Sequence, residues 1–182
     1  MQNDSPYRLD GRTAIVTGAG SGIGRGTALE MAKAGADIVV AELQPDAAEE
    51  TAAMVRGLGR HALVVITDVT STESVDAMMT AALREFGGVD VLVNNVGGLG
   101  PRPKKTTIVD LDLAEWESLL RLNLTSQFIC CKAFVTSLLE KGGKGAVVNI
   151  ASLAALVPYE TSVVYGAAKA GVVSMTQTLA AE

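Results

Sequence analysis

The chain has 182 residues, a formal net charge of −5 and 48% hydrophobic residues. This length is sufficient to bury a sizeable core, and it indicates a single domain over residues 1–182. The acidic balance, together with the lack of any Lys/Arg cluster with interleaved aromatic residues, argues against a nucleic-acid-binding surface, and the PRPKK segment at 101–105 is interpreted as a solvated loop.

Short β-branched runs alternate with helical patterns along the whole chain. In chain order the pattern predicts a strand at 13–18, a helix at 22–35, a strand at 37–42, a helix from Pro45 into the RGLG segment, a strand at 61–68, a helix from a Thr70–Glu73 capping box to Gly87, a strand at 89–95, two helices at roughly 112–122 and 124–140, a strand at 145–151, and a helix from about Ser162.

The predicted strands are continuous apolar runs and do not alternate between apolar and polar residues. Such strands are buried on both faces, as in a parallel sheet that is covered by helices. The sequence therefore predicts an α/β fold with a doubly wound parallel sheet and helices on both faces, similar to the Rossmann fold. In this architecture ligands bind at the carboxyl ends of the strands.

The segment TGAGSGIG, residues 17–24, directly follows the first predicted strand. Glycines at Gly18, Gly22 and Gly24 permit a tight turn and bring backbone amides and the helix N-terminus close to a phosphate. Ser21 and Ile23 complete the loop. Because the loop lies at the first strand–helix junction, it predicts a dinucleotide-binding site.

Glu42 ends the second predicted strand, eighteen residues beyond Gly24. A carboxylate there can accept hydrogen bonds from the ribose hydroxyls of an adenosine, and it repels a 2′-phosphate. Neither Ser21 nor Leu43 supplies a positive charge, and Arg25 is the nearest cation. We therefore predict NAD as the cofactor, with NADP as the less favoured choice; a solvated strand-end glutamate is the alternative interpretation of Glu42.

Polar residues also follow the third and fourth predicted strands. Asp68 and Val69 can contact an adenine, with the carboxylate accepting from its exocyclic amine. Asn94 and Asn95 close the fourth strand and can tie strands together by side-chain hydrogen bonds, while Gly97 allows a ligand to approach the backbone closely. All of these positions are at carboxyl ends of strands, where the fold predicts a ligand.

Tyr165 and Lys169 are four residues apart, so they share one face of the last predicted helix. A phenol has a reference pKa near ~10 and is a poor base at neutral pH, but a nearby ammonium favours its ionised form. A tyrosine in this setting can give or take the proton of an alcohol/carbonyl pair. Ser152 follows the fifth strand and can bind the same oxygen, although a Tyr–Lys pair alone is usually a surface pair.

The combined pattern resembles the short-chain dehydrogenase/reductase family over essentially the whole chain. The matching residues are TGAGSGIG at 17–24, DV at 68–69, NNVG at 94–97, LNL around Asn123, Ser152, and YGAAK at 165–169. Ser152 precedes Tyr165 by thirteen residues, as in that family. One departure is Val96, which replaces the alanine of the family's usual NNAG and adds bulk near the cofactor.

The resemblance implies a role for each of these residues. Tyr165 is the general acid/base, and Lys169 favours its ionised form and binds the nicotinamide ribose. Ser152 orients the substrate carbonyl, and Asn123 supports a water that links Lys169 to solvent. The implied reaction is hydride transfer between NAD(H) and a secondary alcohol or ketone, with the cofactor supplying the redox chemistry. The flanking segments suggest a neutral, hydrophobic small-molecule substrate, with Tyr159 as a candidate contact and Trp116 as a packing residue.

Members of the family are usually longer, with further strands and a substrate-covering segment after the catalytic helix. The resemblance therefore predicts that the fifth strand is an open sheet edge. It also implies association through the helix that carries Tyr165, into a homo-dimer or homo-tetramer. The alternative function is a truncated dinucleotide-binding or interaction module with weak catalysis.

Other features indicate where the protein is located. The N-terminal segment MQNDSPYRLDGR has no apolar core and is not a signal peptide, and no apolar run approaches the ~18 residues of a membrane span. Cys130 and Cys131 are predicted to be reduced, buried thiols, and His61 lacks partners for a metal site. We therefore expect a soluble, cytoplasmic protein without membrane association or bound metal.

Overall fold

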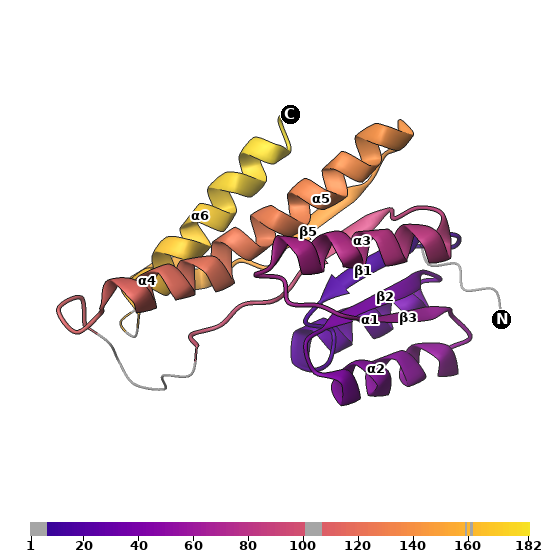
Figure 1. Cartoon of the computed structure of the whole chain (residues 1–182), viewed down its shortest axis with the longest axis horizontal. Coiled ribbons are helices and arrows are strands. Elements are labelled where there is room, and N and C mark those ends of the chain that lie inside the picture. Colours follow the sequence, from indigo (N-terminus) through magenta and orange to yellow (C-terminus); the bar gives the residue numbers. More distant parts are fainter. Residues whose placement is uncertain (1–6, 101–106, 159, 161) are drawn as a thin grey trace.

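The computed structural model describes residues 7–100, 107–158, 160 and 162–182. The PRPKK segment and Tyr159, for which the sequence suggested a solvated loop and a substrate contact, lie outside the described residues. The described chain forms one five-stranded parallel sheet with helices on both sides (Figure 1). The predicted fold class is therefore confirmed.

The sheet has the strand order β3-β2-β1-β4-β5. Its strands are β1 (Thr13–Thr17), β2 (Asp37–Glu42), β3 (Ala62–Ile66), β4 (Val91–Asn94) and β5 (Ala146–Asn149). All four neighbouring pairs are parallel. The order reverses after β3, where the chain crosses from one edge of the sheet to pair β4 with β1, and this reversal creates the ligand-binding position of a doubly wound fold.

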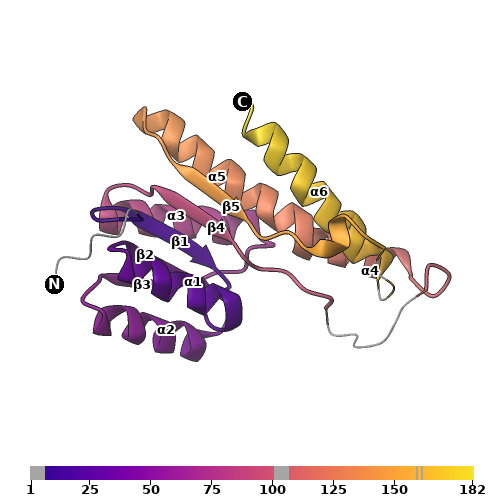
Figure 2. The same cartoon turned by 180° about the vertical axis from the view of Figure 1, so that it is seen from behind.

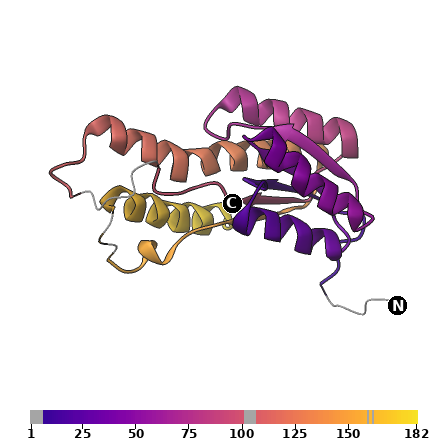
Figure 3. The same cartoon turned by 90° about the horizontal axis from the view of Figure 1, so that it is seen from below.

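Helices cover the two faces of the sheet in two groups. The helices are α1 (Gly22–Lys33), α2 (Pro45–Gly57), α3 (Thr72–Phe86), α4 (Leu113–Leu120), α5 (Ser126–Lys141) and α6 (Val163–Leu179), with a short 3₁₀ turn at Leu153–Ala155. Figure 3 shows α3 and α5, in magenta and orange, on one side of the strands and α1, in indigo, on the other. The molecule therefore has three layers, helices–sheet–helices.

Alternate residues of the strands supply two separate cores, because successive side chains point to opposite faces. Ile15 and Leu92 pack with Met78 and Phe134 from α3 and α5. Val16 packs on the other face with the alanines of α1 and α2. Small residues on α1 and α2 let these helices approach the sheet closely, and this fixes where their N-termini lie.

The capping box predicted at Thr70 and Glu73 is wrong by one residue. The Thr70 hydroxyl donates to Asp68 Oδ1 at 2.7 Å and is therefore engaged outside the helix. Ser71 is the N-cap, and its hydroxyl accepts from the Ser74 N–H at 3.2 Å. At the other end Gly87 adopts φ +75°, a conformation that favours glycine, and stops α3 as predicted.

The two helices predicted at 112–122 and 124–140 are one continuous helix, Leu113–Lys141. A π-helical turn at Arg121–Thr125 joins α4 to α5 without a break. The turn frees a carbonyl of the preceding α-helix, and the Asn123 side chain compensates by donating to Leu119 O at 3.0 Å. Such turns are difficult to predict because they disturb the helical period by only one residue.

By length and composition this 29-residue helix could cross a membrane, although the sequence shows no apolar run that approaches ~18 residues. The same test is passed by core helices of soluble proteins. In α5 the buried side chains include Ile129 and Phe134, which pack in the core between the helices and the sheet. This placement is that of a core helix.

Strand β5 is a sheet edge, as predicted, but it is not buried on both faces. Its residues alternate between exposed and half-buried, whereas every residue of β1 is buried. Val147 packs against the core that contains Phe134, while Val148, on the opposite face, is 46% exposed. The reason is that α1 and α2 contact β1, β2 and β3 and leave this face of β5 uncovered (Figure 2).

The two cysteines are buried, and the single histidine packs against an aromatic ring. Cys130 and Cys131 are buried free thiols, as predicted, and burial, with a smaller effect of Cys131, raises the pKa of Cys130 to about 12. The exposed His61 stacks edge-on against Phe86 with ring centroids 5.3 Å apart. Trp116 is half-buried on α4.

Replacing Phe134 by alanine should destabilise the fold strongly. Phe134 is fully buried, so its truncation is expected to lower the free energy of unfolding by about 3–5 kcal/mol. Phe128 lies on the same helix but is 52% exposed, and Phe128→Ala should cost less than about 1 kcal/mol. Urea unfolding of the two variants measures the difference, and equal losses would contradict the assigned packing.

Candidate active site

A cleft of about 570 Å³ lies at the carboxyl ends of the five strands. Most of the predicted site residues line it: Gly18, Ser21, Gly22, Ile23, Glu42, Asp68, Val69, Asn95, Gly97, Tyr165 and Lys169. The strand arrows in Figure 2 point toward this end of the sheet. Gly18 and Lys169, at the two ends of this range of the sequence, are thus brought to one cleft.

The glycine loop between β1 and α1 packs closely against the start of α1 and against Asn95 after β4. Gly18 and Gly22 have φ of +64° and +52°, which favour glycine. A Cβ atom on Gly24 would lie 2.1 Å from Gly18 O and 2.6 Å from Asn95 Nδ2. Gly24 therefore allows α1 to begin directly behind the loop.

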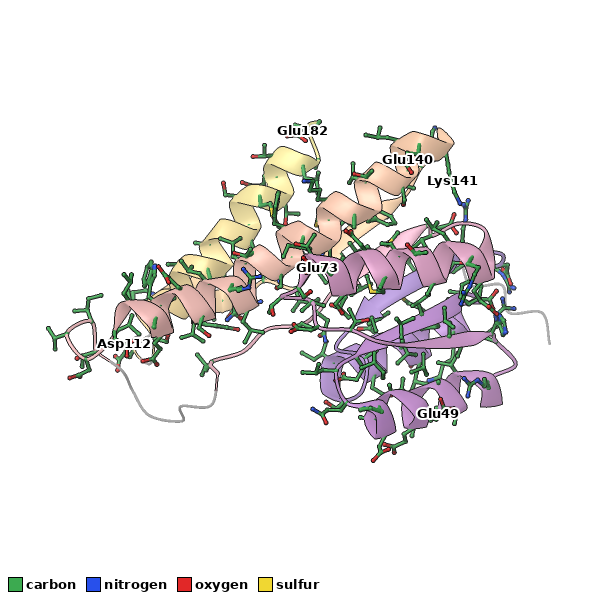
Figure 4. All side chains as sticks on the ribbon, viewed as in Figure 1. Glu49, Glu73, Asp112, Glu140, Lys141 and Glu182 are labelled. Atoms are coloured by element: carbon green, nitrogen blue, oxygen red, sulfur yellow. The ribbon has the colours of Figure 1, made fainter. Side chains whose placement is uncertain are left out.

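The N-terminus of α1 is uncapped. Ser21 is its N-cap residue but makes no side-chain capping bond, and the first turn carries no acidic residue. Ser71, Asp112 and Ser162 do cap their helices α3, α4 and α6, and Figure 4 labels Asp112 at the start of α4. An uncapped N-terminus that opens into a cleft has free amide donors and a positive dipole end, which fit a phosphate group.

Asn95 connects the ends of β4 and β1. Its Nδ2 donates to Thr17 O and Gly18 O at 3.0 and 3.2 Å, and its backbone N–H donates to Thr17 Oγ1 at 3.0 Å. These bonds hold the start of the glycine loop against the neighbouring strand. The predicted role of this residue in tying strands together matches the geometry.

Glu42 folds back onto the glycine loop. Its Oε2 accepts from the Gly20 N–H at 2.9 Å, and its Oε1 accepts from the backbone N–H groups of Leu43 and Gln44 at 2.8 and 3.1 Å. A Cβ on Gly20 would lie 2.7 Å from Oε2. The carboxylate is thus held at the rim of the cleft with its orientation fixed by three backbone donors.

Asp68 and Val69 form the adjacent wall. Hydrogen bonds from the Thr70 hydroxyl and the Thr70 backbone N–H lower the pKa of Asp68, so this carboxylate is ionised at neutral pH. Val69 is 5% exposed and gives the wall an apolar surface. An acceptor beside an apolar surface suits a flat heterocycle with an amino group.

Lys169 is 2% exposed, which is unusual for a lysine. Its Nζ donates to Ile150 O at 2.7 Å and lies 5.8 Å from the centroid of the Tyr165 ring. Burial lowers the pKa of Lys169. Since an ammonium has three donors, two remain beyond the bond to Ile150 for a ligand, a water or the neighbouring phenol.

Asn123 lies behind the cleft and does not line it. Its Oδ1 accepts from the Gly98 N–H and its Nδ2 donates to Gly98 O, both at 2.8 Å. A Cβ on Gly97 would lie 2.8 Å from Asn123 Oδ1 and 3.0 Å from Lys169 Nζ. Asn123 Oδ1 and Lys169 Nζ therefore both lie close to the position that a side chain at Gly97 would occupy.

Ser152 follows Ala151, which lines the cleft, but Ser152 itself is not among the lining residues. It is half-buried and caps the 3₁₀ turn, accepting from the Ala154 N–H at 3.2 Å. The 3₁₀ turn packs against α6, the helix that carries Tyr165. Ser152 is thus placed beside the helix that carries Tyr165, and its hydroxyl is bound within its own turn.

Several lining residues were not predicted from the sequence. These are Thr67, Thr70, Leu122, Ile150 and Ala151. Among these residues, Ile150 has a direct contact with a predicted catalytic residue, because its carbonyl accepts a hydrogen bond from Lys169. Its position directly after β5 was the available signal, but backbone acceptors carry no residue-type pattern.

Within the ranges that the structure describes, no group of three or more His, Cys, Asp or Glu side chains could hold a metal ion. The cleft instead offers backbone amides, carboxylates and one buried ammonium. These donors and acceptors fit a phosphate-containing dinucleotide.

The doubly wound sheet, the uncapped glycine loop and the cleft at the strand ends define a dinucleotide-binding α/β protein. A family profile described as short chain dehydrogenase matches residues 12–182. The chain belongs to this family, the short-chain dehydrogenases/reductases. The family assignment made from the sequence motifs is confirmed.

Relatives show how much of the family's length is present. D-threitol dehydrogenase of Mycolicibacterium smegmatis is 42% identical over 180 residues, which are 98% of this chain and 67% of that protein. The solved structure of 7α-hydroxysteroid dehydrogenase with NADH and 7-oxo glycochenodeoxycholic acid matches with a TM-score of 0.89 and 35% identity, over 99% of this chain and 68% of the other. NAD⁺-bound xylitol dehydrogenase matches with a TM-score of 0.88 and 31% identity, over 96% and 65%.

The chain therefore spans about two thirds of the length of these relatives. About a third of the length of each relative lies outside the match.

The buried Lys169 should make stability depend on pH. Because burial lowers its pKa, the unfolded chain binds more protons than the folded chain between that lowered value and the reference value near ~10.4. The free energy of unfolding of the wild type therefore rises with pH in this window. Lys169→Met lacks this contribution, so its stability relative to the wild type should fall as pH rises from neutral to ~10.4.

Urea unfolding at a series of pH values measures this difference. Lys33→Met, at an exposed lysine on α1, is the control and should show a nearly constant difference. A constant difference for Lys169→Met as well would contradict the effect of burial.

Proposed function

We propose that the protein is an NAD-dependent oxidoreductase that transfers a hydride between a secondary alcohol or ketone and NAD(H). The observation that carries this proposal is the shared cleft. The uncapped N-terminus of α1, the rim carboxylate Glu42 and the pair Tyr165–Lys169 all line it. Dinucleotide binding and proton transfer therefore have their residues in one place.

Tyr165 is proposed as the general acid/base on the substrate oxygen. Ser162 caps α6 by accepting from the Tyr165 N–H at 3.3 Å, which fixes the tyrosine in the first turn of a rigid helix. The Lys169 ammonium lies one turn further on, with Nζ 5.8 Å from the centroid of the Tyr165 ring. The bound dinucleotide supplies the hydride donor or acceptor, and Tyr165 transfers the proton that balances it.

Lys169, Asn123 and Ser152 are proposed to support this step. The bond from Lys169 Nζ to Ile150 O orients the ammonium, whose remaining donors can bind the nicotinamide ribose. Asn123 stabilises the π-turn and the backbone at Gly98, so that a water near Gly97 can link Lys169 to solvent. Ser152 is proposed to orient the substrate oxygen, supported by its position between Ala151 and the turn that packs on α6.

The proposed preference for NAD over NADP depends on charge. Glu42 lines the cleft, and Lys169 is the one cation among the lining residues that the structure describes. Gly18, Ser21, Gly22, Ile23 and Gly24 are proposed to surround the phosphates, and Asp68, Val69, Asn95 and Gly97 the adenine and nicotinamide halves. A 2′-phosphate near Glu42 would meet a carboxylate without a compensating cation.

The substrate is proposed to be a small molecule with a neutral secondary alcohol or ketone. Two of the relatives are named for polyols and one for a hydroxysteroid. The turn after Ser152 carries the exposed side chains of Leu153 and Leu156. These favour an apolar substrate, with a steroid-like or acyl compound as the leading class.

Assembly and location are also proposals. The exposed apolar Phe128 on α5 and Val163 on α6 support association into a homo-dimer or homo-tetramer. The two buried free thiols suit a reducing, cytoplasmic compartment. The weakly catalytic binding module is not favoured, because the Tyr165–Lys169 pair lies in the same cleft as the glycine loop.

Tyr165→Phe should strongly reduce turnover while leaving NAD binding almost unchanged, since the ring remains and only the phenolic hydroxyl is lost. General acid/base catalysis contributes about 10²–10⁴-fold, and we expect a loss in kcat of this size. The assay is nicotinamide absorbance with a panel of secondary alcohols and ketones. Tyr7→Phe, at a residue that is 81% exposed, is the matched control. Unchanged kcat in the Tyr165 variant would refute its role.

Glu42→Gln should reduce the preference for NAD over NADP by about tenfold. The amide keeps a hydrogen-bonding oxygen but removes the negative charge, which corresponds to about 1.4 kcal/mol. Isothermal titration calorimetry with both dinucleotides measures the ratio. Asp46→Asn removes an exposed charge nearby in α2 and should leave the ratio unchanged; a similar shift in both variants would argue against a direct contact.

A further inference from the structure

The glycine loop is held from behind by side chains of α1 and α2. Thr51 of α2 is fully buried, and its hydroxyl lies 2.9 Å from Ala19 O and 3.2 Å from Ala47 O. Arg25 of α1 donates from Nη2 to Gly20 O at 2.5 Å. Two consecutive carbonyls of the loop are therefore bound on the side away from the cleft.

Arg25, Thr51 and Glu50 form a connected set of hydrogen bonds, here called the loop clamp. Arg25 Nε donates to Thr51 Oγ1 at 3.0 Å, and Nη2 donates to Glu50 Oε2 at 2.6 Å. The Thr51 hydroxyl thus accepts from the arginine and keeps its single proton for a backbone carbonyl. The Arg25 side chain is 23% exposed, and Glu50 anchors it at the outer end.

The loop clamp and Glu42 act on the same residue from opposite sides. The Gly20 carbonyl binds Arg25, while the Gly20 N–H binds Glu42 Oε2 at 2.9 Å. Glu42 lines the cleft and Arg25 does not. The Arg25 guanidinium and the Glu42 carboxylate thus bind the same peptide residue, Gly20, but the guanidinium also donates to Glu50 on α2.

We propose that the loop clamp is a specificity-determining device: Thr51 and Arg25 position the glycine loop for the dinucleotide, and Glu50 holds Arg25 away from the site of a 2′-phosphate. This inference rests on the proposed function and extends it to residues outside the cleft. Two carboxylates then disfavour NADP by different means. Glu42 repels the 2′-phosphate. Glu50 forms an ion pair with Arg25, the cation that would otherwise bind this phosphate.

The positioning role is tested on Thr51, by measuring NAD affinity with isothermal titration calorimetry. Thr51→Val removes the hydroxyl and keeps the shape, and it should weaken NAD binding about five- to tenfold, as expected for a lost hydrogen bond. Thr51→Ser keeps the hydroxyl and should retain most of the affinity. Thermal unfolding by circular dichroism checks that both variants are folded. Equal NAD affinity in the valine variant and the wild type would overturn the positioning role.

The specificity role is tested on Glu50, which is largely exposed, so its replacement should not disturb folding. Glu50→Ala should strengthen NADP binding at least fivefold and leave NAD binding almost unchanged. A general loosening of the loop would instead weaken both dinucleotides.

Glu49→Ala is the matched control. Glu49 lies on the same helix (Figure 4) and pairs with Arg56. It removes the same charge without releasing Arg25, and should not alter the NADP/NAD ratio. Adding Arg25→Met to Glu50→Ala should remove the gain in NADP affinity.

The outcomes separate the two proposals. A wild-type chain that binds neither dinucleotide would overturn the proposed function together with this inference. A wild type that binds NAD, with equal shifts in the Glu49 and Glu50 variants or a gain that persists without Arg25, would overturn the specificity role alone.

Discussion

The close approach of α1 to the end of β1 is the constraint on which the site depends. At Gly24 a methyl group would lie 2.1 Å from Gly18 O, so any other residue would push the helix away from the loop. Because α1 begins so close, its uncapped amides open into the cleft, and Asn95 can reach across to bind Thr17 O and Gly18 O. The loop, the helix terminus and the fourth strand are thus fixed relative to one another before any ligand binds.

Two features of the site reduce the stability of the fold but supply groups for ligand binding and proton transfer. An uncapped helix forgoes the capping bond that α3, α4 and α6 possess, and such a bond typically contributes about 1 kcal/mol. Lys169 is buried with a backbone carbonyl as its hydrogen-bond acceptor, and the pKa shift records the cost of desolvation. Such local departures from the most stable arrangement are common at functional sites.

The sequence allowed the fold class and most cleft residues to be predicted, because strand ends and glycine spacing are local patterns. It did not reveal the π-turn at Arg121–Thr125, which differs from an α-helix by one residue in register. It placed a helix cap at Thr70 instead of Ser71, since the competing bond to Asp68 is visible only in three dimensions. Backbone contacts such as that of Ile150 O with Lys169, and the loop clamp between α1 and α2, likewise depend on packing between distant elements.

The cleft at the strand ends is proposed to bind NAD through the glycine loop. Amide hydrogen exchange with and without saturating NAD tests it most directly, because it reports where the ligand acts and requires no substrate. Binding in the cleft should slow exchange in the glycine loop and around Asp68 and Asn95, with little change along α3 and α5. No protection, or protection confined to residues away from the cleft, would contradict the assignment of this site.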